Sequence, residues 1–175
     1  MSLSVPTLAE LMDGCTRSAV HLEMRDHYGV AAEAADFRAW LETGRLDTDP
    51  DSPGWAPWVA LVSRTVARGV AVRRARIVSE PVSDYIHYEH ASTVVNVNAG
   101  EEVRWLPRRR ASGIALPGND FWLFDDRTIR WGYFSGDGAL VGHEVSEDPA
   151  AAKLCTEAFD TVWARAVPHS QYEIH

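Results

Sequence analysis

The stretch NDFWLFDD, residues 119–126, decides how the second half of the chain folds. Apolar residues occupy every position of its FWLF segment (121–124), which predicts a strand that is covered on both faces. The segment TIRWGYFS at 128–135 predicts the second strand of a hairpin. Asp125 and Asp126 come between the two strands, and aspartate favours turns. We therefore interpret the two carboxylates as a turn, and the alternative is a catalytic acid at the end of a strand.

The other patterns predict alternating helices and strands. A helix remains possible at 18–28, where apolar alternation favours a strand. The predicted helices lie at 7–13, 30–42, 58–68, 83–95 and 149–167, and the predicted strands at 18–28, 70–80, 101–108 and 139–147. From residue 58 onward the order is α-β-α-β-β-β-β-α, which predicts an α/β fold with a mixed sheet flanked by helices.

One loop divides the chain. Residues 46–57 (LDTDPDSPGWAP) contain three aspartates and three prolines, a composition typical of a loop or linker. We expect residues 1–45 to form an N-terminal arm of helix and strand that packs on a main domain at 58–175. The length suits one compact domain overall.

The composition is that of an ordinary globular protein of 175 residues. The formal net charge of −8 argues against direct binding of nucleic acid. Cys15 and Cys155 are far apart and lack metal-ligand spacing, so we expect no disulfide and a cytoplasmic location. Neither a signal peptide nor a membrane-spanning run is recognisable. We expect no cofactor, because the nucleotide-binding glycine motifs, the nucleophile elbow and Cys-x-x-Cys are missing.

The basic residues are concentrated in the middle of the chain. Residues 64–110 contain nine arginines and five acidic residues, and Lys153 is the one lysine of the sequence. The arginine bias reflects either a GC-rich genome or a patch that binds phosphate or carboxylate. We interpret the basic loop at 107–110 (PRRR) as solvated, or as docking to an acidic partner.

The stretch SDYIHYEH, residues 83–90, is the most site-like part of the sequence. On a helix, one face carries the histidines and a neighbouring face carries the tyrosines and Glu89. These groups can exchange protons near neutral pH, and in an enzyme the catalytic set would be Tyr85, His87, Glu89 and His90. Two histidines at i, i+3 lack a third ligand, so we expect no metal site. The alternative is a solvated amphipathic helix.

A second candidate segment is HLEMRDHY, residues 21–28. On a strand, His21, Glu23 and Arg25 line one face. Glu23 and Arg25 then form either a plain ion pair or part of an arm that folds over a pocket. The full expected ligand-binding set is His21, Glu23, Arg25, Tyr85, His87, Tyr88, Glu89, Arg104, Trp105 and Asp120.

Residues 58–166 resemble one half of a phospholipase D-like domain in the order of their helices and strands and in their sequence. The resemblance rests on a helix ending ARGVAVR, a strand EEVRWLP, a strand closing on FDD and a last helix AFDTVWARA. It implies the α/β fold of that family. The family reaction needs His-x-Lys-x4-Asp, in which the histidine attacks phosphorus and the lysine neutralises phosphate charge. With Asp126 in the last position, Asn119 and Phe121 replace the histidine and the lysine.

Four sequence segments also resemble those of an uncharacterised actinobacterial family of small cytoplasmic proteins. They are LEMRDHY (22–28), VSEPVSDYIHYEH (78–90), AGEEVRWLPR (99–108) and DFWLFDD (120–126). Many members are encoded beside helix-turn-helix regulators, and the resemblance carries no established activity.

Two functional hypotheses follow. The first is a non-hydrolytic phospholipase D-like protein that binds a small ligand or a helix-turn-helix partner in regulation. The second is a small cofactor-free isomerase, cyclase or transferase of specialised metabolism that uses His, Glu and Tyr as acids and bases, with Arg104 holding an anion. An enzyme needs these groups in one water-excluding pocket.

Overall fold

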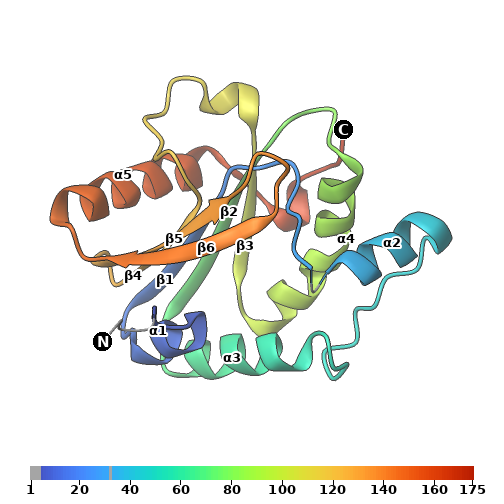
Figure 1. The fold of residues 1–175 in the computed structure, drawn as a ribbon, viewed down its shortest axis with the longest axis horizontal. Helices are drawn as coiled ribbons and strands as arrows, with labels where there is room; N and C mark the ends of the chain where they lie inside the picture. The colour runs from blue at the N-terminus through green and yellow to red at the C-terminus, as the bar shows by residue number, and fades with distance from the viewer. Residues whose placement is uncertain (1–4, 32) are drawn as a thin grey trace.

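The computed structural model describes residues 5–31 and 33–175 and consists of one sheet with helices on both faces (Figure 1). The strands are β1 (Ser18–Glu23), β2 (Ala71–Val78), β3 (Glu102–Pro107), β4 (Phe121–Phe124), β5 (Thr128–Phe134), β6 (Leu140–Ser146) and β7 (Val167–Pro168). The helices are α1 (Leu8–Gly14), α2 (Ala34–Thr43), α3 (Ala56–Ala67), α4 (Asp84–Ala99) and α5 (Pro149–Arg165), with short 3-10 helices at Arg108–Ala111 and His169–Gln171. The predicted α/β fold with a mixed sheet is confirmed.

The strand order is β6-β5-β4-β1-β2-β3-β7, which places β1 in the middle of the sheet. β1 pairs in parallel with β2 and antiparallel with β4. The segment 1–45, which was expected to pack as an arm on the main domain, therefore contributes an interior strand to the sheet. Leu22 on β1 is fully buried, and an apolar strand of this kind is buried most completely between two others.

The hairpin predicted from NDFWLFDD is confirmed. β4 and β5 pair antiparallel and turn at residues 125–127. Asp125 and Asp126 have φ values of 52° and 57°, the left-handed region that aspartate tolerates better than most residues. The Asp125 carboxylate accepts hydrogen bonds from the backbone N–H groups of Thr16, Arg17 and Ser18. Asp125 therefore ties the hairpin to the start of β1 and has a structural role.

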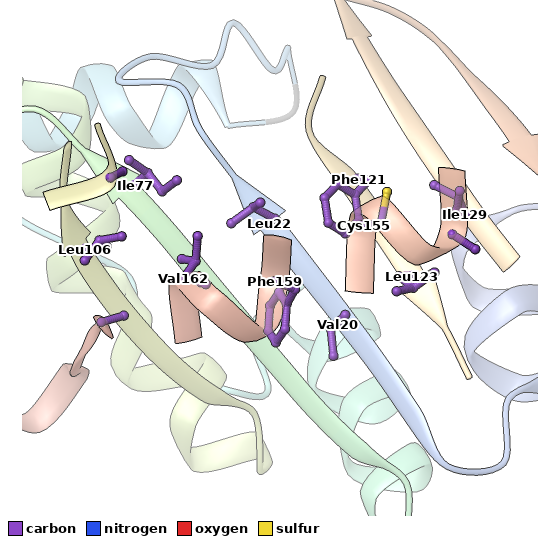
Figure 2. Packing of buried hydrophobic residues seen from close by; sticks show 14 residues of the cluster. Val20, Leu22, Ile77, Leu106, Phe121, Leu123, Ile129, Cys155, Phe159 and Val162 are labelled. Atoms are coloured by element: carbon purple, nitrogen blue, oxygen red, sulfur yellow. The ribbon is translucent and has the colours of Figure 1, made fainter. Parts of the chain in front are cut away.

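One face of the sheet packs against α5 and forms a hydrophobic core (Figure 2). Alternate residues of β1, β2, β4 and β5 contribute to it, as the period of two along a strand requires. Phe159 and Val162 of α5 are buried there, as the amphipathic pattern predicts. Leu154 was expected in the same stripe but is 39% exposed, because it lies on the flank of the helix one residue before Cys155.

The other face of the sheet is covered by two separate groups of helices. α1 and α3 pack on its lower half in Figure 1 through a cluster that includes Met12, Val62 and Trp122. α4 packs on β2 and β3 through Ile86 and Trp105, and α2 lies against α4. Among the helices of the described chain, none combines the length and apolarity that a bilayer crossing requires.

Candidate functional site

A cavity of about 640 Å³ lies between this second face of the sheet and the surrounding helices. Its walls come from β1, β2, β4, β5, β6 and α4, from the first turns of α1, α2 and α3, and from the segments that precede α2 and α3. Its aromatic lining residues are Tyr28, Trp55, Trp58, Tyr85, Tyr88, Phe121, Trp122 and Phe134. A concave, largely aromatic cavity with a few polar groups is the usual form of a small-molecule site.

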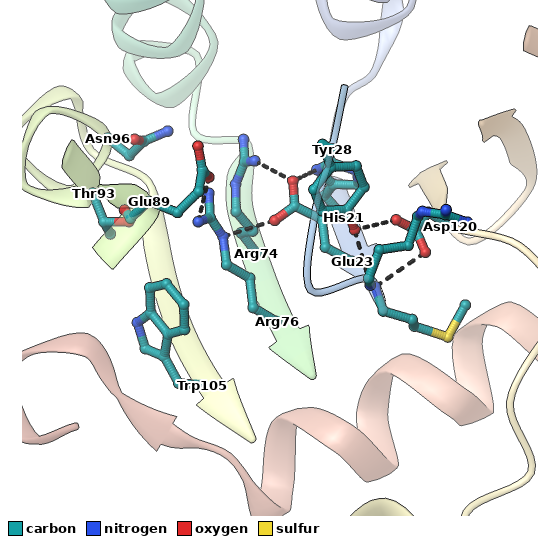
Figure 3. A network of polar contacts seen from close by, with 12 residues as sticks. His21, Glu23, Tyr28, Arg74, Arg76, Glu89, Thr93, Asn96, Trp105 and Asp120 are labelled. Atoms are coloured by element: carbon teal, nitrogen blue, oxygen red, sulfur yellow. Dashed lines mark hydrogen bonds and ion pairs between the residues drawn. The ribbon is translucent and has the colours of Figure 1, made fainter. Parts of the chain in front are cut away.

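The floor of the cavity is a network of buried charges that spans three elements (Figure 3). Arg74 and Arg76 project from β2 on the cavity side, two residues apart, and both are buried. The two oxygens of Glu23 on β1 pair with them, at 2.8 Å from Arg74 Nη1 and 2.7 Å from Arg76 Nε. Glu89 of α4 pairs with Arg76 Nη1, and Glu101 pairs with Arg74 Nε at 2.7 Å.

The electrostatics of this network hold its charges in place. Burial alone raises the pKa of Glu23, but the charges of Arg76 and Arg74 outweigh it and lower the pKa to about 2. Asn96 donates a hydrogen bond of 2.8 Å to the second oxygen of Glu101. Paired and hydrogen-bonded charges of this kind form a rigid floor rather than free reactive groups.

Asp120 occupies the start of β4 at the edge of this floor. Tyr28 donates its hydroxyl to one oxygen, and the backbone N–H of Met24 donates to the other at 3.0 Å. Burial raises the pKa of Asp120 to about 6, with a further contribution from the charge of Glu23.

Glu33 lies in the opposite wall, where it precedes α2 and lines the cavity. The hydroxyl of Tyr85 donates a hydrogen bond of 2.8 Å to Glu33 Oε2. Burial, followed by repulsion from Glu89, raises the pKa of Glu33 to about 7. Glu33 and Asp120 are therefore cavity carboxyl groups that can hold or release a proton near neutral pH.

The raised pKa of Glu33 predicts a specific dependence of stability on pH. Between the ordinary pKa of 4.5 and about 7, the folded protein holds a proton on Glu33 that the unfolded chain releases. The contribution of Glu33 to the free energy of unfolding therefore falls as the pH rises through this window. Glu33→Gln has no carboxyl group at this position and therefore lacks this loss. Urea denaturation should show that, as the pH rises from 4.5 to about 7, the free energy of unfolding falls more in the wild type than in Glu33→Gln. The exposed Glu42→Gln serves as the control, and parallel curves for wild type and Glu33→Gln contradict the assignment.

The structure divides the expected ligand-binding residues into two sets. Lining the cavity are His21, Glu23, Tyr85, Tyr88, Glu89 and Asp120. Outside its lining are Arg25, His87, His90, Arg104 and Trp105. The catalytic set proposed from SDYIHYEH is thereby split, because Tyr85 and Glu89 face the cavity and the two histidines do not.

The helical period explains where the histidines lie. His87 is exposed, and its ring is 5.6 Å from that of Trp40 on α2. His90 turns toward the end of the chain, with Nε2 3.2 Å from the carbonyl oxygen of Tyr172. Residues 85, 88, 89, 92 and 96 instead follow the i, i+3, i+4 spacing of one helix face, which is the face toward the cavity.

The two arginines outside the lining have other contacts. Arg104 lies on the α5 face of the sheet, donates to the carbonyl of Trp163 at 3.0 Å and stacks on the Trp163 ring. Glu23 does not form the proposed ion pair with Arg25 and pairs with Arg74 and Arg76 of β2 instead. β1 ends at Glu23, so Arg25 leaves the alternation of the strand and packs over the Phe134 ring at 5.1 Å.

Trp105 supports the site from behind. Its side chain is fully buried, and the guanidinium of Arg76 lies 5.0 Å from the ring centre. Its indole N–H donates to His169 Nδ1 at 3.1 Å. Trp105 therefore helps to position Arg76.

Several site residues were missed by reasoning from the sequence. They are Tyr28, Glu33, Trp58, Arg74, Arg76, Asn96, Glu101, Trp122 and Arg130. A signal was present for Arg74 and Arg76, because they occupy alternate positions of a strand flanked by valines and must therefore share one buried face. Over residues 5–31 and 33–175, no group of three His, Cys, Asp or Glu side chains is arranged to hold a metal ion.

Comparison with known proteins places this geometry in context. A family model described as "Domain of unknown function (DUF6879)" matches residues 6–174. No curated protein sequence matches the chain.

Two solved structures are similar in fold. One is the phospholipase D family member Nuc from Salmonella typhimurium, with a TM-score of 0.52, 12% identity, and coverage of 91% of this chain and 86% of Nuc. The other is the archaeal chromatin protein TrmBL2, with a TM-score of 0.48, 12% identity, and coverage of 91% of this chain and 48% of TrmBL2. At this identity the likeness to Nuc shows the fold alone. It extends beyond the resemblance at 58–166, because it covers 91% of this chain.

Proposed function

The chain belongs to the family described as a domain of unknown function, DUF6879, and from this premise we propose that it is a non-hydrolytic, phospholipase D-like protein that binds a small organic ligand in its cavity. One observation carries the proposal. The cavity has aromatic walls above a floor whose arginines are already paired with carboxylates of the same chain. Such a floor is preorganised, and preorganisation lowers the entropic cost of binding.

The sequence supports binding without phosphodiester hydrolysis by the family motif. That motif requires a histidine two residues before a lysine. The one lysine is Lys153, and Ala151 stands two residues before it. Two of the cavity arginines, Arg74 and Arg76, cannot replace the lysine freely, because they are held by Glu23, Glu89 and Glu101.

The competing hypothesis is a cofactor-free acid–base enzyme. Its proposed residues Tyr85, His87, Glu89 and His90 do not share one pocket in this fold. The raised pKa values of Glu33 and Asp120 favour proton transfer, so any such reaction would use these two carboxyl groups. Turnover of a bound ligand that is lost in both Glu33→Gln and Asp120→Asn would establish the enzyme and overturn the binding protein.

We also propose that ligand binding is linked to a protein partner, with a helix-turn-helix regulator as the expected class. The support is the position of β6, which is the last strand of the sheet and lines the cavity through Leu140 and His143. Its neighbour Val141 is 66% exposed, and an uncovered sheet edge can pair with another chain. Co-purification from the native host with identification by mass spectrometry tests this link.

Filling the cavity should abolish ligand binding. Ser92 is buried on the cavity face of α4, so Ser92→Phe places a ring in the ligand space without removing an ion pair. We expect fragments from a small-molecule library to raise the unfolding temperature of the wild type by mass action, and this increase to vanish in Ser92→Phe.

The matched control is Ser112→Phe, which adds the same ring at an exposed position outside the cavity. It should bind fragments as the wild type does. Retention of all fragment binding in folded Ser92→Phe would show that the cavity is not the binding site.

A further inference from the structure

Arg130 is the charged cavity residue whose guanidinium is not used by the fold. It projects from β5 on the cavity face, directly opposite Trp122 of β4. Its buried Nε has no hydrogen-bond partner within the described part of the chain. Arg74 and Arg76, by contrast, are each paired with two carboxylates.

A second buried nitrogen atom without a partner, and a stacked histidine ring, lie around the same tryptophan. The Trp58 ring is 6.1 Å from the Trp122 ring, and its buried indole N–H has no acceptor among the described residues. The His21 ring stacks on Trp122 with centres 4.4 Å apart, and its Nδ1 lies 3.5 Å from Glu23 Oε1. Buried polar groups without partners are rare and point to a missing hydrogen-bond partner.

We propose that this corner of the cavity, formed by Arg130, His21, Trp58 and Trp122, binds the carboxylate of a monoanionic ligand whose apolar or aromatic body lies along the aromatic walls. The inference rests on the proposed ligand-binding function and names the chemical class of the ligand. A carboxylate can accept two hydrogen bonds from one guanidinium and a third from an indole N–H.

The charge of the surroundings selects a monoanion over a phosphate. Burial lowers the pKa of His21 to about 3 and also lowers that of His143, so near pH 7 both rings are neutral. The corner therefore contributes one positive charge, from Arg130. The ion network of the cavity floor sets three carboxylates, Glu23, Glu89 and Glu101, against the two arginines 74 and 76, and its net negative charge disfavours a second negative charge on the ligand.

The test uses four probes that share a naphthalene ring: 2-naphthylacetate, 2-naphthylacetamide, 2-naphthyl phosphate and 2-naphthylmethylamine. Binding to the full chain is measured by titration calorimetry and by quenching of tryptophan fluorescence. We expect the acetate to bind best and to weaken about 10- to 100-fold in Arg130→Gln, the usual range for loss of a hydrogen-bonded charge. The neutral amide should bind both proteins equally, and Arg130→Lys should weaken the acetate less than Arg130→Gln.

The control variant is Arg110→Gln, which removes an exposed arginine outside the cavity and should leave all four affinities unchanged. Unfolding curves of each variant verify that the fold is intact. Equal binding of the acetate to wild type and Arg130→Gln, or preference for the phosphate or the amine, overturns the carboxylate site while ligand binding in the cavity stands. If no probe binds, and if the library fragments also raise the unfolding temperature of Ser92→Phe as much as that of the wild type, the proposed function itself is wrong.

Discussion

Replacing Glu23 with alanine is expected to lower the free energy of unfolding by about 3–5 kcal/mol, because it breaks a buried ion network from one side. Glu23 neutralises Arg74 and Arg76 together, and the side chains of these arginines are 10% and 5% exposed. Without Glu23, Arg74 keeps only Glu101 and Arg76 keeps only Glu89, so each buried guanidinium loses one of its two ion pairs. Urea denaturation followed by circular dichroism measures the loss, with the slope of the transition as a check on two-state behaviour.

A matched variant separates burial from charge pairing. Glu102 of β3 pairs with Arg73 of β2 at 3.5 Å, but the two side chains are 59% and 41% exposed. Exposed ion pairs contribute between 0 and about 1 kcal/mol, so Glu102→Ala should have a small effect. Similar losses for Glu23→Ala and Glu102→Ala would mean that the network is well solvated and does not form a rigid cavity floor.

Leu22→Ala should destabilise the protein by about 2–5 kcal/mol, as expected when a fully buried leucine leaves a cavity in a core. Leu22 lies on β1 in the centre of the sheet, with no exposed surface, and packs in the core beneath α5 (Figure 2). An N-terminal arm packed on the outside of a domain would tolerate the same substitution with a much smaller loss. Chemical denaturation of the two proteins distinguishes these cases.

Val141→Ala is the control for this substitution. Val141 lies on the edge strand β6 with 66% of its surface exposed, so the variant should stay within about 0.5 kcal/mol of the wild type. A loss below 1 kcal/mol for Leu22→Ala would show that β1 is not held between β2 and β4 in solution.

Local pattern was sufficient for most elements of the fold. Thr7 and Ser83 cap α1 and α4, next to where the predicted helices 7–13 and 83–95 begin, and each accepts a hydrogen bond from a backbone N–H of the first turn. The hairpin at 121–134 and the amphipathic α5 also follow from the residues themselves. These features depend on neighbours a few positions apart, which a single sequence displays directly.

The candidate site was predictable only in part. Tyr85, Tyr88 and Glu89 could be assigned to one helix face, because the helical period is a local property. The packing of α4 on the sheet decides which of its faces meets the cavity, this one or the neighbouring face with the histidines. The local sequence pattern does not predict that packing. The sequence pattern therefore placed His87 and His90 in the site although they lie outside the cavity lining, and it did not indicate Glu33 or Arg130.

Residue patterns along the chain specify the helices and strands, the burial of FWLF on both faces and the alternation of polar and apolar faces along each strand. The position of β1 between β2 and β4 comes from the folded chain as a whole, and it brings Glu23 to Arg74, 51 positions further along the chain. The reason is physical: periodicity specifies which face of a strand is buried, whereas the neighbours of a strand are decided by the combined packing of all helices on both faces. The buried ion network and the cavity above it are products of that packing.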